Sequence, residues 1–123
     1  MKKILVIEDN ENNLYLIKYI LQHNNFEVIE ARDGAEGVET VAREIPDLIL
    51  LDIQLPVMDG YEAARRLKEN EKTGYIPIIA ITSFALTGDR EKALQAGCDG
   101  YIEKPINPET IMDEISKYLR LCI

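Results

Sequence analysis

The sequence has 123 residues, of which 46% are hydrophobic and 29% are charged, a composition typical of a globular domain. Apolar runs fall well short of the roughly 18 residues that a membrane span needs. Fourteen basic and 22 acidic residues give a net charge of −8, which disfavours binding to nucleic acid. With only two cysteines, in no metal-binding spacing, we expect one cytoplasmic domain spanning residues 1–123, with no membrane or nucleic-acid partner.

Short apolar runs alternate along the chain with segments of helical periodicity. The first helical segment is preceded by Asn12 and Asn13, either of which is an expected N-cap. In chain order we predict a strand at 4–7, a helix with apolar positions from 14 to 21, a strand at 26–29, a helix from 33 to the stop at Pro46, a strand at 48–51, a loop at 53–60, a helix over 61–70, a strand at 77–82, a helix over 89–96, a strand at 100–102 and a helix over 108–119.

Five strands alternating with five helices predict a doubly wound parallel α/β sheet. Such sheets place their chemistry outside the carboxyl ends of the strands. The residues at these positions are Glu8, Asp9, Asp52, Thr82 and Lys104. Three carboxylates at one edge would repel each other unless a cation joins them, and oxygen ligands suit Mg²⁺ or Mn²⁺. Lys104 and Thr82 add a positive charge and a hydroxyl, the groups that a transferred phosphoryl group needs, and Asp52 is a candidate nucleophile.

Six motifs make the sequence resemble the receiver domains of two-component response regulators over essentially the whole chain. They are ILVIEDN (4–10), PDLILLD (46–52), LPVMDG (55–60), ITS (81–83), GCDGY (97–101) and KP (104–105). Within that family the segments 82–85 and 102–106 are similar to stand-alone DivK-type regulators and to the receivers of hybrid kinases. The resemblance implies a (βα)5 flavodoxin-like sheet with strand order 2-1-3-4-5.

By this resemblance, a histidine kinase or a histidine phosphotransfer protein donates the phosphoryl group of a phosphohistidine to Asp52. Mg²⁺, or Mn²⁺, would be held by Glu8, Asp9, Asp52 and the backbone carbonyl of Gln54, and Lys104 would pair with the phosphoryl oxygens. Apart from loss of its own phosphoryl group, the domain is not expected to be an enzyme.

The resemblance also implies a switch in which Thr82 turns toward the phosphoryl group and Tyr101 turns inward. This would change the face made by the fourth helix, fifth strand and fifth helix, where a downstream protein would bind. The peptide bond before Pro105 is expected to be cis. Gln54 and Phe84 lie two residues after Asp52 and Thr82, and we expect them to set the phosphoryl lifetime by controlling the attacking water.

Three other functions compete with this interpretation. Haloacid-dehalogenase-like phosphatases also phosphorylate an aspartate at a strand end, but they need a second aspartate where this chain has Gln54. A flavodoxin-like flavin binder needs a phosphate-binding loop where this chain has Glu8 and Asp9, whose charges would repel phosphate. A receiver-like interaction module that takes no phosphoryl group should lack the acceptor or a metal-binding acid, and this chain has them all.

Overall fold

A five-stranded sheet forms the centre of the computed structural model, which describes residues 1–55, 58–82 and 89–119. All four neighbouring pairs of strands are parallel, in the order β2-β1-β3-β4-β5. The strands are β1 (Lys3–Ile7), β2 (Glu27–Ala31), β3 (Leu48–Asp52), β4 (Ile78–Thr82) and β5 (Gly100–Glu103). The predicted flavodoxin-like fold and its strand order are confirmed.

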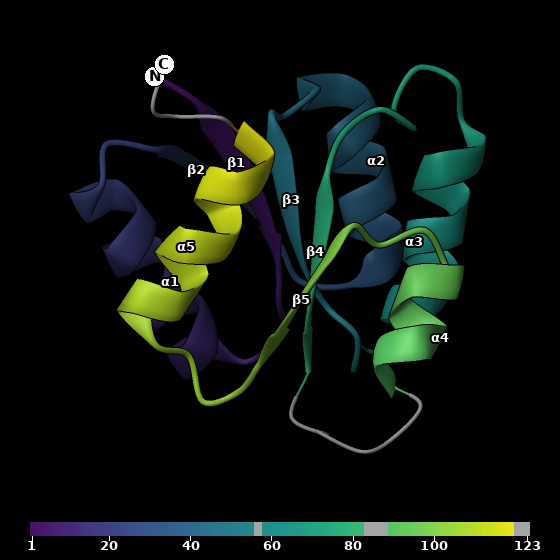
Figure 1. Cartoon of the computed structure of the whole chain (residues 1–123). Coiled ribbons are helices and arrows are strands. Elements are labelled where there is room, and N and C mark those ends of the chain that lie inside the picture. Colours follow the sequence, from purple (N-terminus) through teal and green to yellow (C-terminus); the bar gives the residue numbers. More distant parts are fainter. Residues whose placement is uncertain (56–57, 83–88, 120–123) are drawn as a thin grey trace.

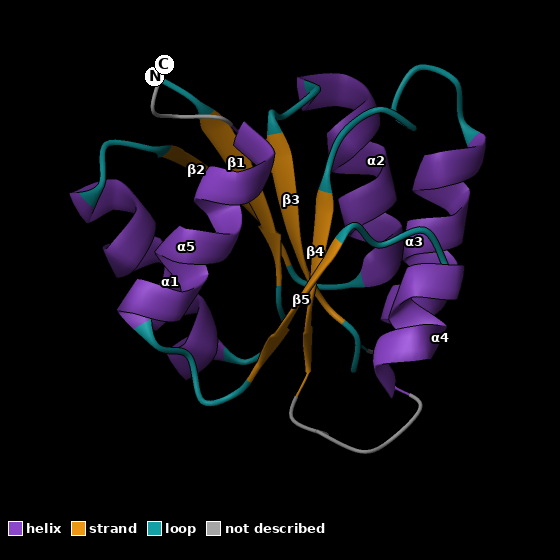
Figure 2. Ribbon diagram, in the orientation of Figure 1, coloured by secondary structure: helices purple, strands orange, loops and turns teal. Residues whose placement is uncertain are grey.

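Helices cover both faces of the sheet, as Figures 1 and 2 show. One face carries α1 and α5, and the other carries α2, α3 and α4. Within the described residues no helix has the length and apolar character needed to cross a bilayer. The helices are α1 (Glu11–His23), α2 (Gly34–Glu44), α3 (Gly60–Glu69), α4 (Asp89–Gln95) and α5 (Pro108–Leu119).

The three central strands are buried because each lies between two layers of helices. Successive side chains of a strand point to opposite faces, so Leu50 packs on the α1 and α5 side while Ile49 and Leu51 pack on the other side. Each buried leucine or isoleucine contributes about 1.5–3 kcal/mol to stability. This core holds the carboxyl ends of β1, β3 and β4 in a fixed arrangement along one edge of the sheet.

Two predicted boundaries are wrong by two or more residues. The N-cap of α1 is Asn10, whose side chain accepts a hydrogen bond from the backbone N–H of Asn13, so neither Asn12 nor Asn13 is the cap. The second strand occupies residues 27–31 instead of 26–29, because the backbone N–H of Phe26 bonds to the end of α1. Pairing with β1 then continues to Ala31, whose carbonyl accepts the backbone N–H of Glu8.

Candidate functional site

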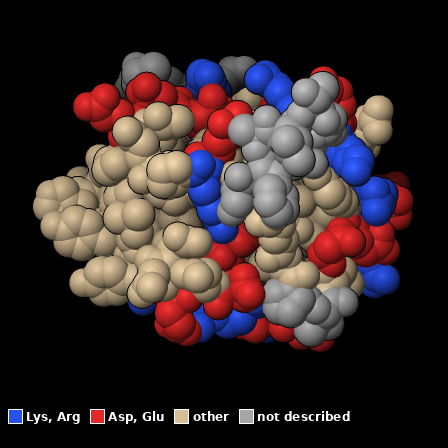
Figure 3. Space-filling model, turned by 90° about the horizontal axis from the view of Figure 1, so that it is seen from below, with Lys and Arg blue, Asp and Glu red and all other residues tan. Residues whose placement is uncertain are grey.

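Three carboxylates meet at the carboxyl edge of the sheet. Glu8 and Asp9 follow β1, Asp52 ends the adjacent strand β3, and one oxygen of each lies within 4.8 Å of the others. Glu8 and Asp52 are buried, whereas Asp9 is exposed. Figure 3 looks onto this edge, where acidic and basic side chains lie next to each other near the middle of the face. The sequence placed these acids correctly because the ends of adjacent parallel strands are neighbours.

Lys104, just beyond the end of β5, reaches into this group of acids. Its Nζ lies 3.0 Å from Oδ2 of Asp52 and 3.4 Å from Oε1 of Glu8. The backbone N–H of Lys104 donates to the carbonyl of Thr82, which fixes the start of the side chain beside the end of β4. The peptide bond between Lys104 and Pro105 is cis, as predicted.

The carboxylate of Asp52 is oriented by two donors. Its Oδ2 accepts a hydrogen bond from Lys104, and its Oδ1 accepts the backbone N–H of Gln54 at 2.8 Å. The bond to Gln54 turns the chain sharply after β3, so the peptide unit of Gln54 stays beside the carboxylate that precedes it. The acceptor candidate and the start of the following loop therefore form one structural unit.

The buried Glu8 carboxyl group has the most perturbed surroundings of the site. Burial raises its pKa from 4.5 to about 7, and the hydrogen bond and negative charge of Asp52 add to this, against smaller opposing effects of Asn10 and Lys104. Burial lowers the pKa of Lys104, but its contacts with Asp52 and Glu8 outweigh that effect, so the pKa is raised. One lysine therefore only partly neutralises the buried acids.

The residues present fit a divalent metal ion. Oε1 of Glu8 is buried and accepts no hydrogen bond from the described residues, although Lys104 lies within ion-pair distance. A buried carboxylate oxygen that accepts no hydrogen bond is costly, and coordination to a cation would reduce that cost. Three carboxylates without nitrogen or sulfur ligands match the preference of Mg²⁺ or Mn²⁺ for oxygen.

Thr82 and Tyr101, the two residues of the predicted switch, project from the same face of the sheet. Ala80 pairs with Tyr101 in register, and Thr82 lies two residues after Ala80, so all three side chains point the same way. Thr82 is buried at the end of β4 and Tyr101 is half-buried against the core on the α4 side. Gln54 is half-buried at the start of the loop, and Phe84 lies outside the described residues.

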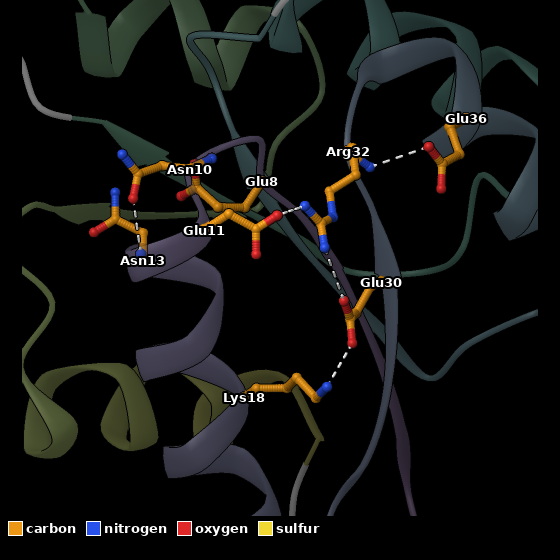
Figure 4. Close-up of polar contacts among 8 residues, drawn as sticks. All are labelled: Glu8, Asn10, Glu11, Asn13, Lys18, Glu30, Arg32 and Glu36. Atoms are coloured by element: carbon orange, nitrogen blue, oxygen red, sulfur yellow. Dashed lines mark hydrogen bonds and ion pairs between the residues drawn. The ribbon is translucent and has the colours of Figure 1, made fainter.

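An ionic network that the sequence patterns did not predict lies on the rim beside the acids, between α1 and the end of β2. Arg32 forms ion pairs with Glu11 and Glu30, and Glu30 also pairs with Lys18 at 2.6 Å (Figure 4). Figure 4 shows the Glu11 carboxylate turned toward Arg32. Opposite charges on α1 and just after β2 were visible in the sequence, but only the packing of α1 beside β2 brings them together.

Gly60 is a second feature of the site that the sequence patterns did not indicate. A Cβ atom at this position would lie 2.7 Å from the carbonyl oxygen of Asp52 and 2.5 Å from Cα of Ile53. The backbone N–H of Gly60 also donates to the carbonyl of Ile53. The start of α3 thus lies directly against the end of β3, which only a residue without a side chain permits. The Asp-Gly pair at the end of the predicted loop was the available signal.

Comparison with known proteins agrees with this geometry. Residues 4–116 match the family model described as "Response regulator receiver domain". The polar-differentiation response regulator DivK of Brucella ovis is 41% identical over 118 residues, which cover 96% of each chain. This similarity confirms the predicted resemblance to DivK-type regulators.

Solved structures with the same fold are also receiver domains. The receiver domain of sensor histidine kinase PA1611 from Pseudomonas aeruginosa, which has a magnesium ion coordinated in its active site cleft, aligns with a TM-score of 0.91 and 37% identity over 97% of this chain and 98% of that one. A chain in the co-crystal structure of the Saccharomyces cerevisiae phosphotransfer protein Ypd1 with the receiver domain of Ssk1 aligns with a TM-score of 0.90 and 28% identity, over 98% and 90% of the two chains. The chain therefore belongs to the response regulator receiver domain family of two-component signalling.

Proposed function

We propose that this receiver domain accepts a phosphoryl group on Asp52 from a phosphohistidine, in a reaction that depends on Mg²⁺ or Mn²⁺. The observation that carries the proposal is the group of three carboxylates, two of which, Glu8 and Asp52, form ion pairs with the half-buried Lys104. Glu8, Asp9, Asp52 and the backbone carbonyl of Gln54 would hold the ion. When bound, the ion would supply positive charge that stabilises the phosphoryl oxygens and offsets the acids.

The contacts of Asp52 and Lys104 suit them to phosphoryl transfer. An oxygen of Asp52 attacks phosphorus, the P–N bond to the donor imidazole breaks, and the imidazole nitrogen keeps the electron pair and takes up a proton. The hydrogen bond from Gln54 to Oδ1 orients the carboxylate for this attack. Lys104, now 3.0 Å from Oδ2, is close enough to transfer its contact to an oxygen of the new phosphoryl group.

The output of the domain is proposed to pass through Thr82 and Tyr101. Their shared face supports a movement in which Thr82 bonds the phosphoryl group and Tyr101 turns into the space that Thr82 leaves. Tyr101 also lines a hollow of about 130 Å³ between α4, β5 and α5, together with Arg90, Leu94 and Lys117. Rotation of Tyr101 would reshape this hollow, which is the surface that we assign to a downstream protein.

The donor is proposed to be a histidine kinase or a histidine phosphotransfer protein, and the co-crystal of Ypd1 with the Ssk1 receiver supports the second type.

We propose that residues 1–123 act as one receiver unit in the cytoplasm. Its only reaction besides phosphoryl acceptance would be loss of its own phosphoryl group. The rate of that loss is assigned to Gln54, whose amide orients water, and to Phe84, whose ring excludes it.

The acceptor is tested with the Asp52→Asn variant, because an amide is not a nucleophile. Asp113→Asn, on the exposed side of α5, makes the same chemical change away from the site. Each protein is incubated with acetyl phosphate and Mg²⁺, and phosphoryl incorporation is measured by intact mass. We expect one phosphoryl group on the wild type and on Asp113→Asn, and none on Asp52→Asn.

Two results would contradict the proposal. Incorporation into Asp52→Asn would place the acceptor at another residue. A wild-type protein that takes no phosphoryl group from acetyl phosphate or from any phosphorylated histidine donor would favour the interaction module that works without phosphorylation.

A further inference from the structure

Two of the three clustered acids lie in the short turn between β1 and α1. Glu8 and Asp9 are consecutive, and Asn10 after them is the N-cap of α1. The backbone N–H of Glu8 donates to the carbonyl of Ala31. This bond fixes where the Glu8 side chain starts, but it leaves the side-chain torsions free and so does not set the direction of the carboxylate. That direction depends on contacts of the carboxylate itself.

The carboxylate of Glu8 is oriented by the backbone of Asn10. Its Oε2 accepts the backbone N–H of Asn10 at 3.2 Å. Its Oε1 is thereby left on the side of Lys104, with 3.4 Å between Oε1 and Nζ. The two oxygens keep these places only while the N–H of residue 10 points back toward Glu8. The conformation of Asn10 therefore decides which oxygen of Glu8 is available to a metal ion.

The conformation of Asn10 is fixed in turn by its own side chain. Oδ1 of Asn10 accepts the backbone N–H of Asn13 at 3.0 Å (Figure 4), and the carbonyl of Asn10 accepts the N–H of Leu14 at 2.9 Å. These two bonds hold residue 10 in the extended conformation of a helix cap, directly before the first turn of α1. A continuous series of hydrogen bonds thus runs from Asn13 through Asn10 to the carboxylate of Glu8.

The sequence offers α1 other places to begin. Asn12 and Asn13 suit an N-cap by residue type as well as Asn10 does. Without the side chain of Asn10, a helix that starts at Asn12 or Asn13 regains a cap bond, and it breaks the bond from Leu14 to the carbonyl of residue 10. Residue 10 then leaves the conformation that directs its N–H to Glu8.

We propose that Asn10 is a positioning residue for the metal site, because its side chain fixes the turn that carries Glu8 and Asp9. The inference rests on the proposed function in one respect, namely that these two acids bind the metal ion. Asn10 itself is not among the proposed ligands. Its cap bond holds the backbone N–H on Oε2 of Glu8 and keeps the exposed Asp9, the residue between them, within reach of Asp52.

The test compares Asn10→Ala, which removes the cap bond, with Asn10→Ser, which keeps an oxygen that caps helices well. Asn107→Ala is the matched control, because Oδ1 of Asn107 accepts the backbone N–H groups of Glu109 and Thr110 at the start of α5. Mn²⁺ affinity is measured from the electron paramagnetic resonance signal of free Mn²⁺. Asn10→Ala should bind roughly ten-fold more weakly, the size of effect seen when groups supporting metal ligands are altered, and the other two variants within roughly two-fold of wild type.

A second measurement needs no metal. Amide hydrogen exchange, followed by NMR on the metal-free protein, reports whether the N–H of residue 10 is still hydrogen-bonded. Its protection should fall in Asn10→Ala and return in Asn10→Ser, while Asn107→Ala leaves it unchanged. Loss of protection together with weaker Mn²⁺ binding would tie the affinity to the orientation of Glu8, since stability alone changes in the control as well.

Three results would overturn the inference. They are an Mn²⁺ affinity of Asn10→Ala within roughly two-fold of wild type, equal weakening in Asn107→Ala or Asn10→Ser, and unchanged protection of residue 10 in Asn10→Ala. If Asn10→Ala does not fold, Asn10→Gln replaces it, because the longer side chain carries the amide past the N–H of Asn13. Wild-type protein that binds no Mn²⁺, or binds it equally after Asp52→Asn, would overturn the proposed metal site and this inference with it, whereas failure of the inference alone leaves wild-type binding intact.

Discussion

Replacing Glu8 with glutamine should stabilise the metal-free protein above neutral pH and have little effect in mild acid. The carboxyl group is 1% exposed, so solvent does not screen its charge. Its pKa is raised from 4.5 to about 7, chiefly by burial, so the folded protein binds this proton more tightly than the unfolded chain does. Protonation of Glu8 therefore stabilises the folded wild-type protein. This stabilisation is complete below pH 4.5 and is lost as the pH rises through about 7.

The size of the effect follows from the two pKa values. One pKa unit corresponds to about 1.4 kcal/mol, so the change from 4.5 to about 7 corresponds to about 3 kcal/mol of lost stability. Glutamine has the same shape and no charge to lose. The difference in free energy of unfolding between Glu8→Gln and wild type should therefore grow by about 2–3 kcal/mol between pH 5 and pH 8, because part of the full change lies below pH 5.

Urea unfolding of both proteins at several pH values, with a chelator present, measures this difference. Acids that do not interact with Glu8 titrate alike in both proteins, so subtraction isolates Glu8 together with its interaction with Asp52. Adding Mg²⁺ to the wild type at pH 8 should recover stability, by about 1.4 kcal/mol at ten times the dissociation constant. A difference between the two proteins that stays constant from pH 5 to pH 8 would refute the reasoning, because Glu8 would then titrate alike in the folded and unfolded states.

Three further measurements address other parts of the molecule. Lys68 donates from Nζ to the carbonyls of Gly74 and Ile76 and to Asp99, so Lys68→Met should lower the free energy of unfolding by about 2–3 kcal/mol, and an unchanged urea midpoint would contradict this. Burial raises the pKa of Cys98 to about 12, so in a Cys122→Ser background iodoacetamide at pH 8 should react with the native protein far more slowly than with the unfolded one. Comparable rates would mean that the thiol is accessible. Phe84→Asn should shorten the phosphoryl lifetime, measured by label decay, because the smaller polar side chain admits water; an unchanged or longer lifetime would exclude the ring from this role.

The fold and the identity of the candidate site residues could be predicted from the sequence because both depend on local patterns. A continuous apolar run such as residues 48–51 indicates a strand buried on both faces, and its end marks the edge where polar residues gather. Parallel strands all have their carboxyl ends at one edge, so Asp9, Asp52 and Lys104 could be brought together without knowledge of any side-chain contact. The sequence motifs therefore predicted the candidate site, and the family that they indicated is confirmed.

The exact ends of helices and strands could be located only in the tertiary structure. Where neighbouring residues are equally suited to a helix end or a strand, contacts with other segments decide between them. Asn10 and Asn13 are equally good caps by residue type, and the position of α1 after β1 selects Asn10. Phe26 suits a strand, but its backbone N–H closes the end of α1, and pairing with β1 sets the register of β2. Such choices depend on residues that are distant along the chain.

The electrostatic state of the site was also decided by the tertiary structure alone. The sequence shows that Glu8 is an acid, but its raised pKa depends on burial by surrounding elements and on Asp52 in another strand. The buried Oε1 of Glu8, which accepts no hydrogen bond from the described residues, and the close approach of Gly60 to Asp52 likewise arise from segments that meet only in the folded chain. Desolvation and close packing are properties of the assembled core. Sequence patterns can therefore predict which residues take part, but not their contacts or their protonation state.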